Sequence, residues 1–134
     1  MSKEKTLCLI KPDAVKKHVI GEIISILEES NFEILKMKML RMDKEIASKF
    51  YAVHKEKHFY NDLIAFMTSG NIVALVLERV NAIKLLHKLC GNTDSTKAAE
   101  NTIRHKFGTD YRVNAVHSSD CPDSANYEIN TIFK

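Results

Sequence analysis

The sequence has few prolines, glycines and cysteines and no long apolar run near its start, which argues against several classes of protein. It has no tryptophan, two prolines and four glycines among 134 residues, so no linker or low-complexity tract divides it. Its three cysteines are odd in number and far apart, which argues against a disulfide framework or a zinc site and favours a reducing cytoplasm. The early apolar run, residues 7–10, is too short for a signal sequence or a membrane span. We therefore expect one cytoplasmic domain over residues 1–134, with no membrane partner.

The composition that is present is that of an ordinary globular protein. Hydrophobic residues make up 45% and charged residues 28% of the chain, and a chain of this length can bury a core without disulfides. The formal net charge is +3. That charge is too small to indicate a specific nucleic-acid partner, although it suits an anionic substrate.

The hydrophobic pattern predicts strands separated by helices. Apolar runs or alternation indicate strands at residues 6–10, 32–40, 72–77 and 113–116. A helical period indicates helices near residues 20–27, 43–53, 61–67, 81–89 and 125–133, with Asn31 ending the first and Asp43 capping the second. This order favours an α+β, ferredoxin-like βαββαβ fold, an antiparallel sheet with helices on one face. A helical hairpin and a long loop near residues 91–112 are expected additions, and such a loop is usually functional.

A histidine and a glutamate are the leading candidates for chemistry. His117 stands at the end of the last predicted strand, and Glu128 follows in the last predicted helix. A carboxylate that holds one ring nitrogen fixes the tautomer and leaves the other lone pair free to attack. A lone histidine is more often structural than catalytic, so these two residues alone leave both interpretations open.

Other candidates are weaker one by one. Lys11 follows the first strand and could reach a ligand at the sheet edge; Phe59 could stack a base; Thr93 and Arg104 in the long loop could donate to phosphates. Each also suits an ordinary structural role: a solvated turn lysine, an aromatic at the core edge, surface polar groups. The chain has no Walker A, GxGxxG or kinase HRD motif. A nucleotide site here would therefore lack a standard phosphate-binding loop.

Several collinear segments nevertheless resemble one family over residues 5–133, the nucleoside diphosphate kinases. The histidine segment is the most specific of them. The matching segments are Ile10-Lys11-Pro12-Asp13-Ala14, Val19-Ile20-Gly21-Glu22-Ile23, Phe50-Tyr51-Ala52-Val53-His54, Thr68-Ser69-Gly70, Gly91-Asn92-Thr93, Thr102-Ile103-Arg104, Asn114-Ala115-Val116-His117-Ser118-Ser119-Asp120, Ser124-Ala125 and Glu128-Ile129.

The resemblance implies a reaction. The γ-phosphate of a nucleoside triphosphate such as ATP would pass to His117 and then to a nucleoside diphosphate, which is a ping-pong mechanism through phosphohistidine. Glu128, helped by Ser119, would orient the ring so that Nδ1 attacks, and Tyr51 would lie beside it.

The resemblance also implies a binding site and partners. The implied nucleotide-binding residues are Lys11, Thr93 and Arg104 at the phosphates, Asn114 at the sugar and phosphate end, and Phe59 at the base. Mg²⁺ would be held mainly by the phosphates, with Asp120 reaching it through water. The family assembles as homo-oligomers, tetramers or hexamers.

The chain departs from the family pattern at places that predict a slower enzyme or weaker nucleotide binding. His87 stands where arginine usually grips phosphate, Ser118 where glycine is common, and residues 100–106 differ from the usual loop, with Asn101 in place of a glycine. Two alternatives to an active kinase follow. One is a kinase-fold nucleotide-binding or regulatory protein with little or no turnover. The other is a ferredoxin-like RNA-binding module, against which the lack of paired strand aromatics and of a basic face argues.

Overall fold

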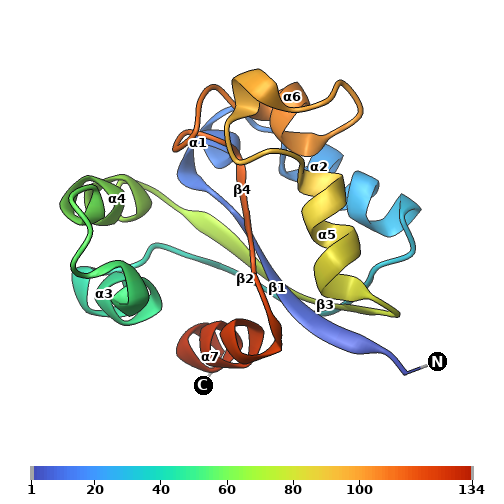
Figure 1. Ribbon diagram of the computed structural model, residues 1–134, viewed down its shortest axis with the longest axis horizontal. Coiled ribbons are helices and arrows are strands. Elements are labelled where there is room, and N and C mark those ends of the chain that lie inside the picture. The colour runs from blue at the N-terminus through green and yellow to red at the C-terminus, as the bar shows by residue number, and fades with distance from the viewer. Residues whose placement is uncertain (1, 134) are drawn as a thin grey trace.

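A four-stranded antiparallel sheet forms the centre of the protein in the computed structural model, which describes residues 2–133 (Figure 1). The strands are β1 (Glu4–Ile10), β2 (Glu33–Leu40), β3 (Ile72–Arg79) and β4 (Val116–Ser118), in the order β2-β3-β1-β4. Helix α2 (Ile20–Glu29) joins β1 to β2, and α5 (Ala82–Cys90) lies between β3 and β4. This is the predicted α+β, ferredoxin-like topology. The prediction of one domain over residues 1–134 includes Met1 and Lys134, which lie outside the described residues.

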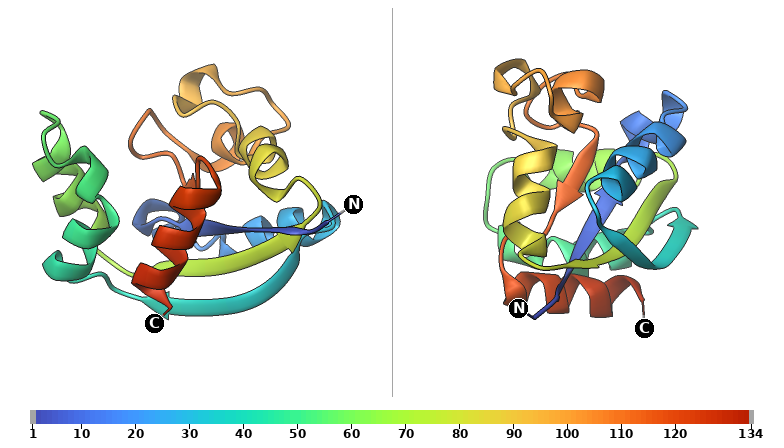
Figure 2. Two further views of the ribbon diagram at one scale, coloured as in Figure 1. Left: turned by 60° about the horizontal axis from the view of Figure 1, so that its bottom comes forward. Right: turned by 90° about the vertical axis from the view of Figure 1, so that its right-hand side faces the viewer.

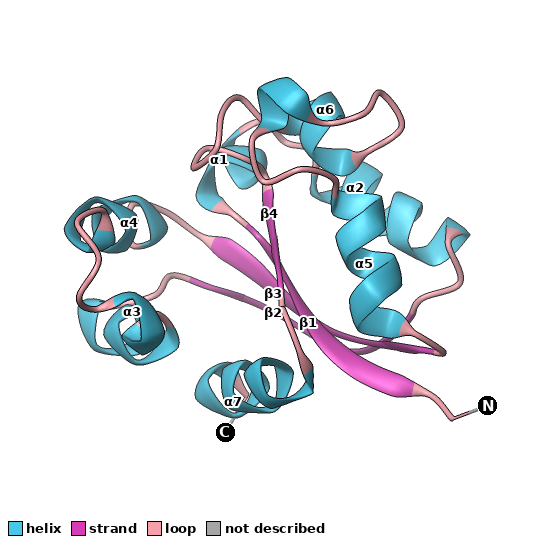
Figure 3. Ribbon diagram, viewed as in Figure 1, coloured by secondary structure: helices cyan, strands magenta, loops and turns pink. Residues whose placement is uncertain are grey.

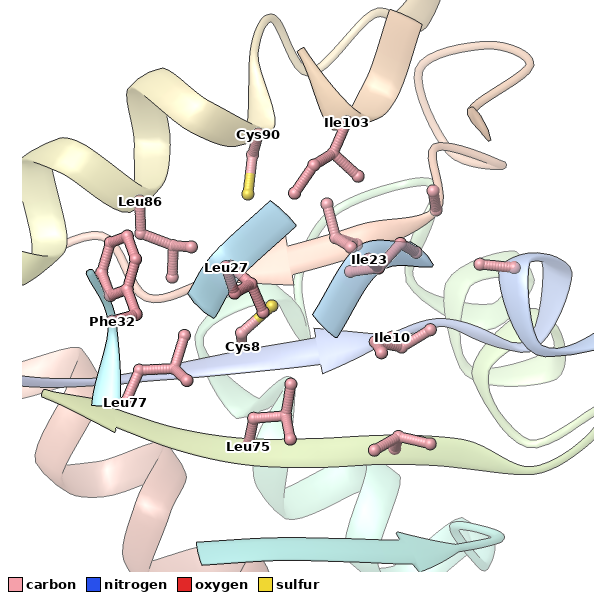
Figure 4. Packing of buried hydrophobic residues seen from close by; sticks show 14 of the residues in the cluster. Cys8, Ile10, Ile23, Leu27, Phe32, Leu75, Leu77, Leu86, Cys90 and Ile103 are labelled. Atoms are coloured by element: carbon pink, nitrogen blue, oxygen red, sulfur yellow. The ribbon is translucent and has the colours of Figure 1, made fainter. Parts of the chain in front are cut away.

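Helices cover both faces of the sheet (Figures 2 and 3). Because side chains alternate along β1, Cys8 and Ile10 pack towards α2 and α5, while Leu7 and Leu9 enter a second core cluster. Figure 4 shows the first cluster, in which Leu27 and Phe32 are among the side chains above the sheet. The second cluster is closed by α3 (Lys44–Phe50), α4 (Tyr60–Met67) and α7 (Pro122–Ile132).

The prediction of helices on one face is correct for the crossover helices α2 and α5 but wrong for the protein as a whole. Residues 7–10 form an unbroken apolar run, so both faces of β1 need cover. The helical hairpin and the last helix supply it on the second face.

Local sequence accounts for two element boundaries as predicted. Asn31 adopts a left-handed conformation, with φ of 66°, just after α2. The Asp43 side chain accepts a hydrogen bond from the Ile46 amide at 2.8 Å and caps α3. No helix within residues 2–133 combines the length and the hydrophobicity of a membrane span.

The structure differs from the local expectations at three places. Lys11, for which a solvated turn was the structural alternative, is buried at the N-cap of α1 (Pro12–Lys16), where a proline at the first position loses no helical hydrogen bond. The long loop contains the 3₁₀ helix η2 (Ser95–Lys97) and α6 (Ile103–Phe107), which are too short to show a period. The last strand begins at Val116 rather than at residue 113, so His117 lies inside the strand, opposite Leu9.

Candidate active site

The predicted site residues surround one cavity of about 700 Å³. One wall is the helical hairpin, which consists of α3, the 3₁₀ helix η1 (Ala52–His54) and α4. The other wall is the segment 87–115, and the floor includes β4. The predicted residues that line it are Lys11, Tyr51, Phe59, Thr93, Arg104, Asn114, His117, Asp120 and Glu128. Ser119 is fully buried beside them and does not line the cavity. The tertiary structure therefore brings together residues from five separate stretches of the sequence.

His117 is held through one ring nitrogen. Its Nε2 lies 2.8 Å from Glu128 Oε1, and the Ser119 hydroxyl donates to the same oxygen at 2.7 Å. A carboxylate only accepts, so Nε2 carries the proton and Nδ1 keeps its lone pair. Nδ1 makes no hydrogen bond with residues 2–133. The arrangement leaves Nδ1 without a hydrogen-bond partner among these residues, on a histidine that lines the cavity.

Two aromatic rings fix the histidine from the hairpin side. The rings of Phe50 and Tyr51 lie edge-on to His117, with centroids at 5.2 Å and 6.4 Å. Burial, and then the nearby Glu128 charge, raise the pKa of the Tyr51 hydroxyl well above its usual range. Tyr51 therefore stays protonated and can act as a hydrogen-bond donor.

Lys11 is buried at the base of the cavity. Its Nζ donates to the Arg112 carbonyl and to Asn114 Oδ1, both at 2.7 Å. The Asn114 amide in turn donates to the Thr93 and Tyr111 carbonyls. Burial lowers the pKa of Lys11 to about 8, partly offset by Asp13. The amine is therefore mostly charged at neutral pH, yet loses that charge at a modestly alkaline one.

Arg104 is a buried cation rather than a surface arginine. Its guanidinium donates to the Gly91 carbonyl at 2.8 Å and to the Val116 carbonyl at 3.0 Å. Its Nε is buried and has no hydrogen-bond partner among residues 2–133. Thr93 lies in the same wall. Two cations and a residue with a hydroxyl thus line the same cavity as His117, an arrangement suited to a polyanion.

His87, Ser118 and Asn101, which depart from the family pattern, all lack a left-handed backbone conformation. His87 lines the cavity with Nε2 3.5 Å from Asp120 Oδ1, and the Asp120 side chain is 86% exposed. Neither Ser118 nor Asn101 has a positive φ; the left-handed residue of this segment is Ala115, with φ of 73°. No left-handed backbone is therefore required of Ser118 or Asn101.

Sequence reasoning missed part of the cavity wall. No sequence pattern assigns a role to His54, although its ring stacks on that of Tyr51 with centroids 6.3 Å apart and lies 5.7 Å from that of Phe59. Tyr111 and Arg112 were not singled out, because the long loop shows no period. The available sequence signal for these two residues was an aromatic side chain next to an arginine in a long loop, a pair that can contact a ligand.

The fold and the site define a ferredoxin-like protein whose carboxylate-oriented histidine faces a cavity rich in hydrogen-bond donors. A family model described as "Nucleoside diphosphate kinase" matches residues 4–134. A nucleoside diphosphate kinase from Halorhodospira halophila is 46% identical over all of this chain and 95% of its own length. The chain belongs to the nucleoside diphosphate kinase family, and with it to the phosphotransferases, as its motifs predicted.

Solved structures agree with this assignment. The nucleoside diphosphate kinase of Aquifex aeolicus matches with a TM-score of 0.97 and 46% identity, over 99% of this chain and 96% of that one. The enzyme of Halobacterium salinarum, solved in complex with CDP, matches with a TM-score of 0.95 and 36% identity, over 99% of this chain and 89% of that one.

Proposed function

We propose that this protein transfers the γ-phosphate of a nucleoside triphosphate such as ATP to a nucleoside diphosphate through phosphohistidine at His117. The observation that carries the proposal is the Glu128–His117 hydrogen bond, which leaves Nδ1 open to the cavity. The Nδ1 lone pair attacks the γ-phosphorus, the bond to the β-phosphate oxygen breaks, and the nucleoside diphosphate departs. A second nucleoside diphosphate then attacks through its terminal phosphate oxygen, and the N–P bond breaks.

The surrounding residues have distinct roles in this proposal. Glu128, positioned by Ser119, balances the charge that the ring gains when Nδ1 is phosphorylated. Lys11, Arg104 and Thr93 bind the phosphates and stabilise the transferring group. Asn114 contacts the sugar and phosphate end, Phe59 stacks on the base, and Tyr51 donates to the γ-phosphate. The CDP complex of the Halobacterium relative supports a nucleotide in this cavity.

Mg²⁺ fits this site only as an ion carried by the nucleotide. Residues 2–133 contain no group of three or more His, Cys, Asp or Glu side chains placed to hold a metal. Asp120, exposed at the cavity, is a suitable partner through water. When bound, Mg²⁺ neutralises part of the phosphate charge.

We also propose a homo-oligomer, a tetramer or a hexamer, in the cytoplasm. Strand β2 is an edge of the sheet and exposes Met37 and Met39 to 60% and 54%. An open apolar edge strand is an expected place for pairing with a second copy of the chain. Sedimentation velocity measures the number of subunits directly.

An acid-quenched labelling experiment tests the reaction. The protein is mixed with γ-labelled ATP and Mg²⁺, then chased with GDP, beside His117→Ala and the control His18→Asn, which alters a histidine outside the cavity. We expect acid-labile label that passes into GTP, is absent from His117→Ala and persists in His18→Asn. Folded wild-type protein without label would reject the kinase proposal. Nucleotide binding without label would then favour the alternative of a protein with little turnover.

A further inference from the structure

Asp13 is a buried carboxylate to which the proposed function gives no role. The residue is 8% exposed and does not line the cavity. Its Oδ2 accepts from the Ala115 amide at 3.0 Å, while Oδ1 is buried and has no hydrogen-bond partner among residues 2–133. Buried carboxylates are normally paired with a cation or hydrogen-bonded at both oxygens. A single hydrogen bond to a distant backbone amide therefore points to a purpose beyond packing.

The Ala115 amide belongs to a strained three-residue turn that leads into β4. The Val116 amide donates to the Asn114 carbonyl at 2.9 Å, across Ala115, and φ of Ala115 is 73°. A γ-turn with a positive φ at its centre is rare and is strained for a residue other than glycine. The turn joins Asn114, which lines the cavity, to the residue before His117.

Two contacts from the start of α1 hold this turn. The Lys11 amide donates to the Ala115 carbonyl at 2.8 Å, and Asp13 Oδ2 accepts from the Ala115 amide. Figure 1 shows α1 beside the end of β4 at which that strand begins. Ala115 is fully buried, so loss of the Asp13 carboxylate would leave its amide unpaired away from water. The strained turn therefore depends on Asp13.

The same contacts fix two residues that the proposed function assigns to the nucleotide. Lys11 Nζ donates to Asn114 Oδ1 at 2.7 Å, in addition to the backbone hydrogen bond between Lys11 and Ala115. Lys11 and Asn114 are thus joined by a side-chain link and a backbone link, and the Asp13 hydrogen bond is next to both. A change in the turn would move the two side chains together.

The charge of Asp13 also acts on Lys11. Burial lowers the pKa of Lys11 to about 8, and Asp13 is the largest influence in the opposite direction. Asp110 raises this pKa as well, whereas the Arg104 and Arg112 cations lower it. Removing the negative charge of Asp13 would therefore leave Lys11 uncharged at a lower pH than in wild type.

We propose that Asp13 is a positioning residue, whose hydrogen bond holds the turn at Ala115 and whose charge attracts the Lys11 cation, so that Lys11 and Asn114 meet the nucleotide in a fixed arrangement. Asp13 itself touches no substrate. The inference rests on the proposed function, because it takes Lys11 and Asn114 to bind the nucleotide. Substitution separates the two effects: Asp13→Asn keeps an oxygen that can accept from Ala115 but loses the charge, and Asp13→Ala loses both.

The pH dependence of kcat/KM tests this proposal, for transfer from ATP to GDP in the presence of Mg²⁺. It is measured for wild type, Asp13→Asn and Asp13→Ala. Asp123→Asn is the matched control, because Asp123 also follows a proline in the first turn of a helix but is exposed and lies outside the cavity. Thermal unfolding shows which variants are folded at the assay temperature. Asp13→Asn, which keeps the size of the side chain, decides alone if Asp13→Ala is unfolded.

We expect kcat/KM of Asp13→Asn to be close to that of wild type at pH ~6.5 but to begin its alkaline fall at a lower pH. Asp13→Ala should show the same shift and also lose about tenfold or more at every pH, because a displacement of about 1 Å in a substrate-binding group can cost about 100-fold. Asp123→Asn should behave as wild type. A merely structural role for Asp13 would lower the melting temperature without moving the pH at which activity falls.

Two results would overturn the inference while label on His117 still supports the kinase. One is an alkaline fall of Asp13→Asn at the same pH as wild type, and the other is a wild-type kcat/KM in folded Asp13→Ala. If wild type takes no label from ATP, the proposed function fails. NMR titration of the Lys11 side chain then decides the inference separately: a lower pKa in Asp13→Asn than in wild type supports it, and equal values overturn it.

Discussion

Replacing Glu128 separates the two ways in which it supports His117, by geometry and by charge. Its Oε1 accepts from both the His117 ring and the Ser119 hydroxyl, and its side chain is only 13% exposed. In Glu128→Gln the amide oxygen can still accept both bonds, but the charge is lost. Glu128→Ala removes the acceptor altogether. The two variants should therefore differ in how much they slow phosphorylation of His117.

Hydrogen bonds to a charged group contribute about 1.5–3 kcal/mol and neutral ones about 0.5–1.5 kcal/mol. Glu128→Gln loses the difference between a charged and a neutral hydrogen bond, about 1 kcal/mol, and should slow phosphorylation by about fivefold. Glu128→Ala loses the whole charged bond and should slow it by about 10- to 150-fold. Rapid-quench measurement of label transfer from ATP gives these rates, with Glu22→Gln as a control at an exposed glutamate outside the cavity.

Thermal unfolding must show that each variant is folded at the assay temperature. A wild-type rate in folded Glu128→Ala would refute the reasoning, since His117 would then need no acceptor at Nε2. Equal losses in the Gln and Ala variants would refute the separation of charge from geometry. Ser119→Ala, which removes one of the two bonds to Oε1, should fall between wild type and Glu128→Ala.

Three further predictions concern pH, phosphate binding and stability. Because burial lowers the pKa of Lys11 to about 8, kcat/KM should fall about tenfold per pH unit above that value, and a flat profile up to pH ~9.5 would contradict this. The lowered pKa also means that the folded state binds fewer protons than the unfolded state, so the Lys11 contribution to the unfolding free energy should rise from about pH 8 to about 10.5. His87→Arg should tighten ATP binding by about ten- to hundredfold in calorimetry, whereas unchanged affinity would exclude a phosphate contact at this position. Gly91→Ala should lower the unfolding free energy by about 2 kcal/mol or more in denaturant titration, because φ of Gly91 is +90° and an added Cβ would lie 2.6 Å from Thr102 Oγ1. The control is Gly21→Ala, where an added Cβ would meet no atom within 4 Å, and this variant should be as stable as wild type or more stable.

The strand and helix order was predictable because it depends on local periodicity. Residues 7–10 and 72–77 are unbroken apolar runs, and Asn31 and Asp43 mark helix boundaries through their own backbone and side-chain preferences. The short elements in the long loop were not predictable, since α6 has five residues and shows no pattern. The start of β4 was missed for a related reason. Side chains of Asp110 and Asn114, rather than residue type along the strand, hold residues 109–114 in a turn.

The candidate site residues were named from the sequence, mostly through the family resemblance, but their environment could not be predicted from it. Lys11 and Arg104 look alike in sequence, as cations near loops. Both are buried and held by backbone carbonyls of other segments. For Lys11 that carbonyl belongs to Arg112, near the other end of the chain, and for Arg104 the carbonyls belong to Gly91 and Val116 on either side of it. The lowered pKa of Lys11 follows from that burial and not from its neighbours in the chain.

The sequence by itself determined the family and the topology, because these depend on residue types at fixed spacing. Only the tertiary structure decided that both faces of the sheet are covered and that His117 lies within β4, opposite Leu9. It also decided that Tyr111 faces the cavity. These features depend on how distant segments pack and on which side chains hold an irregular loop, and neither is expressed as a period along the chain.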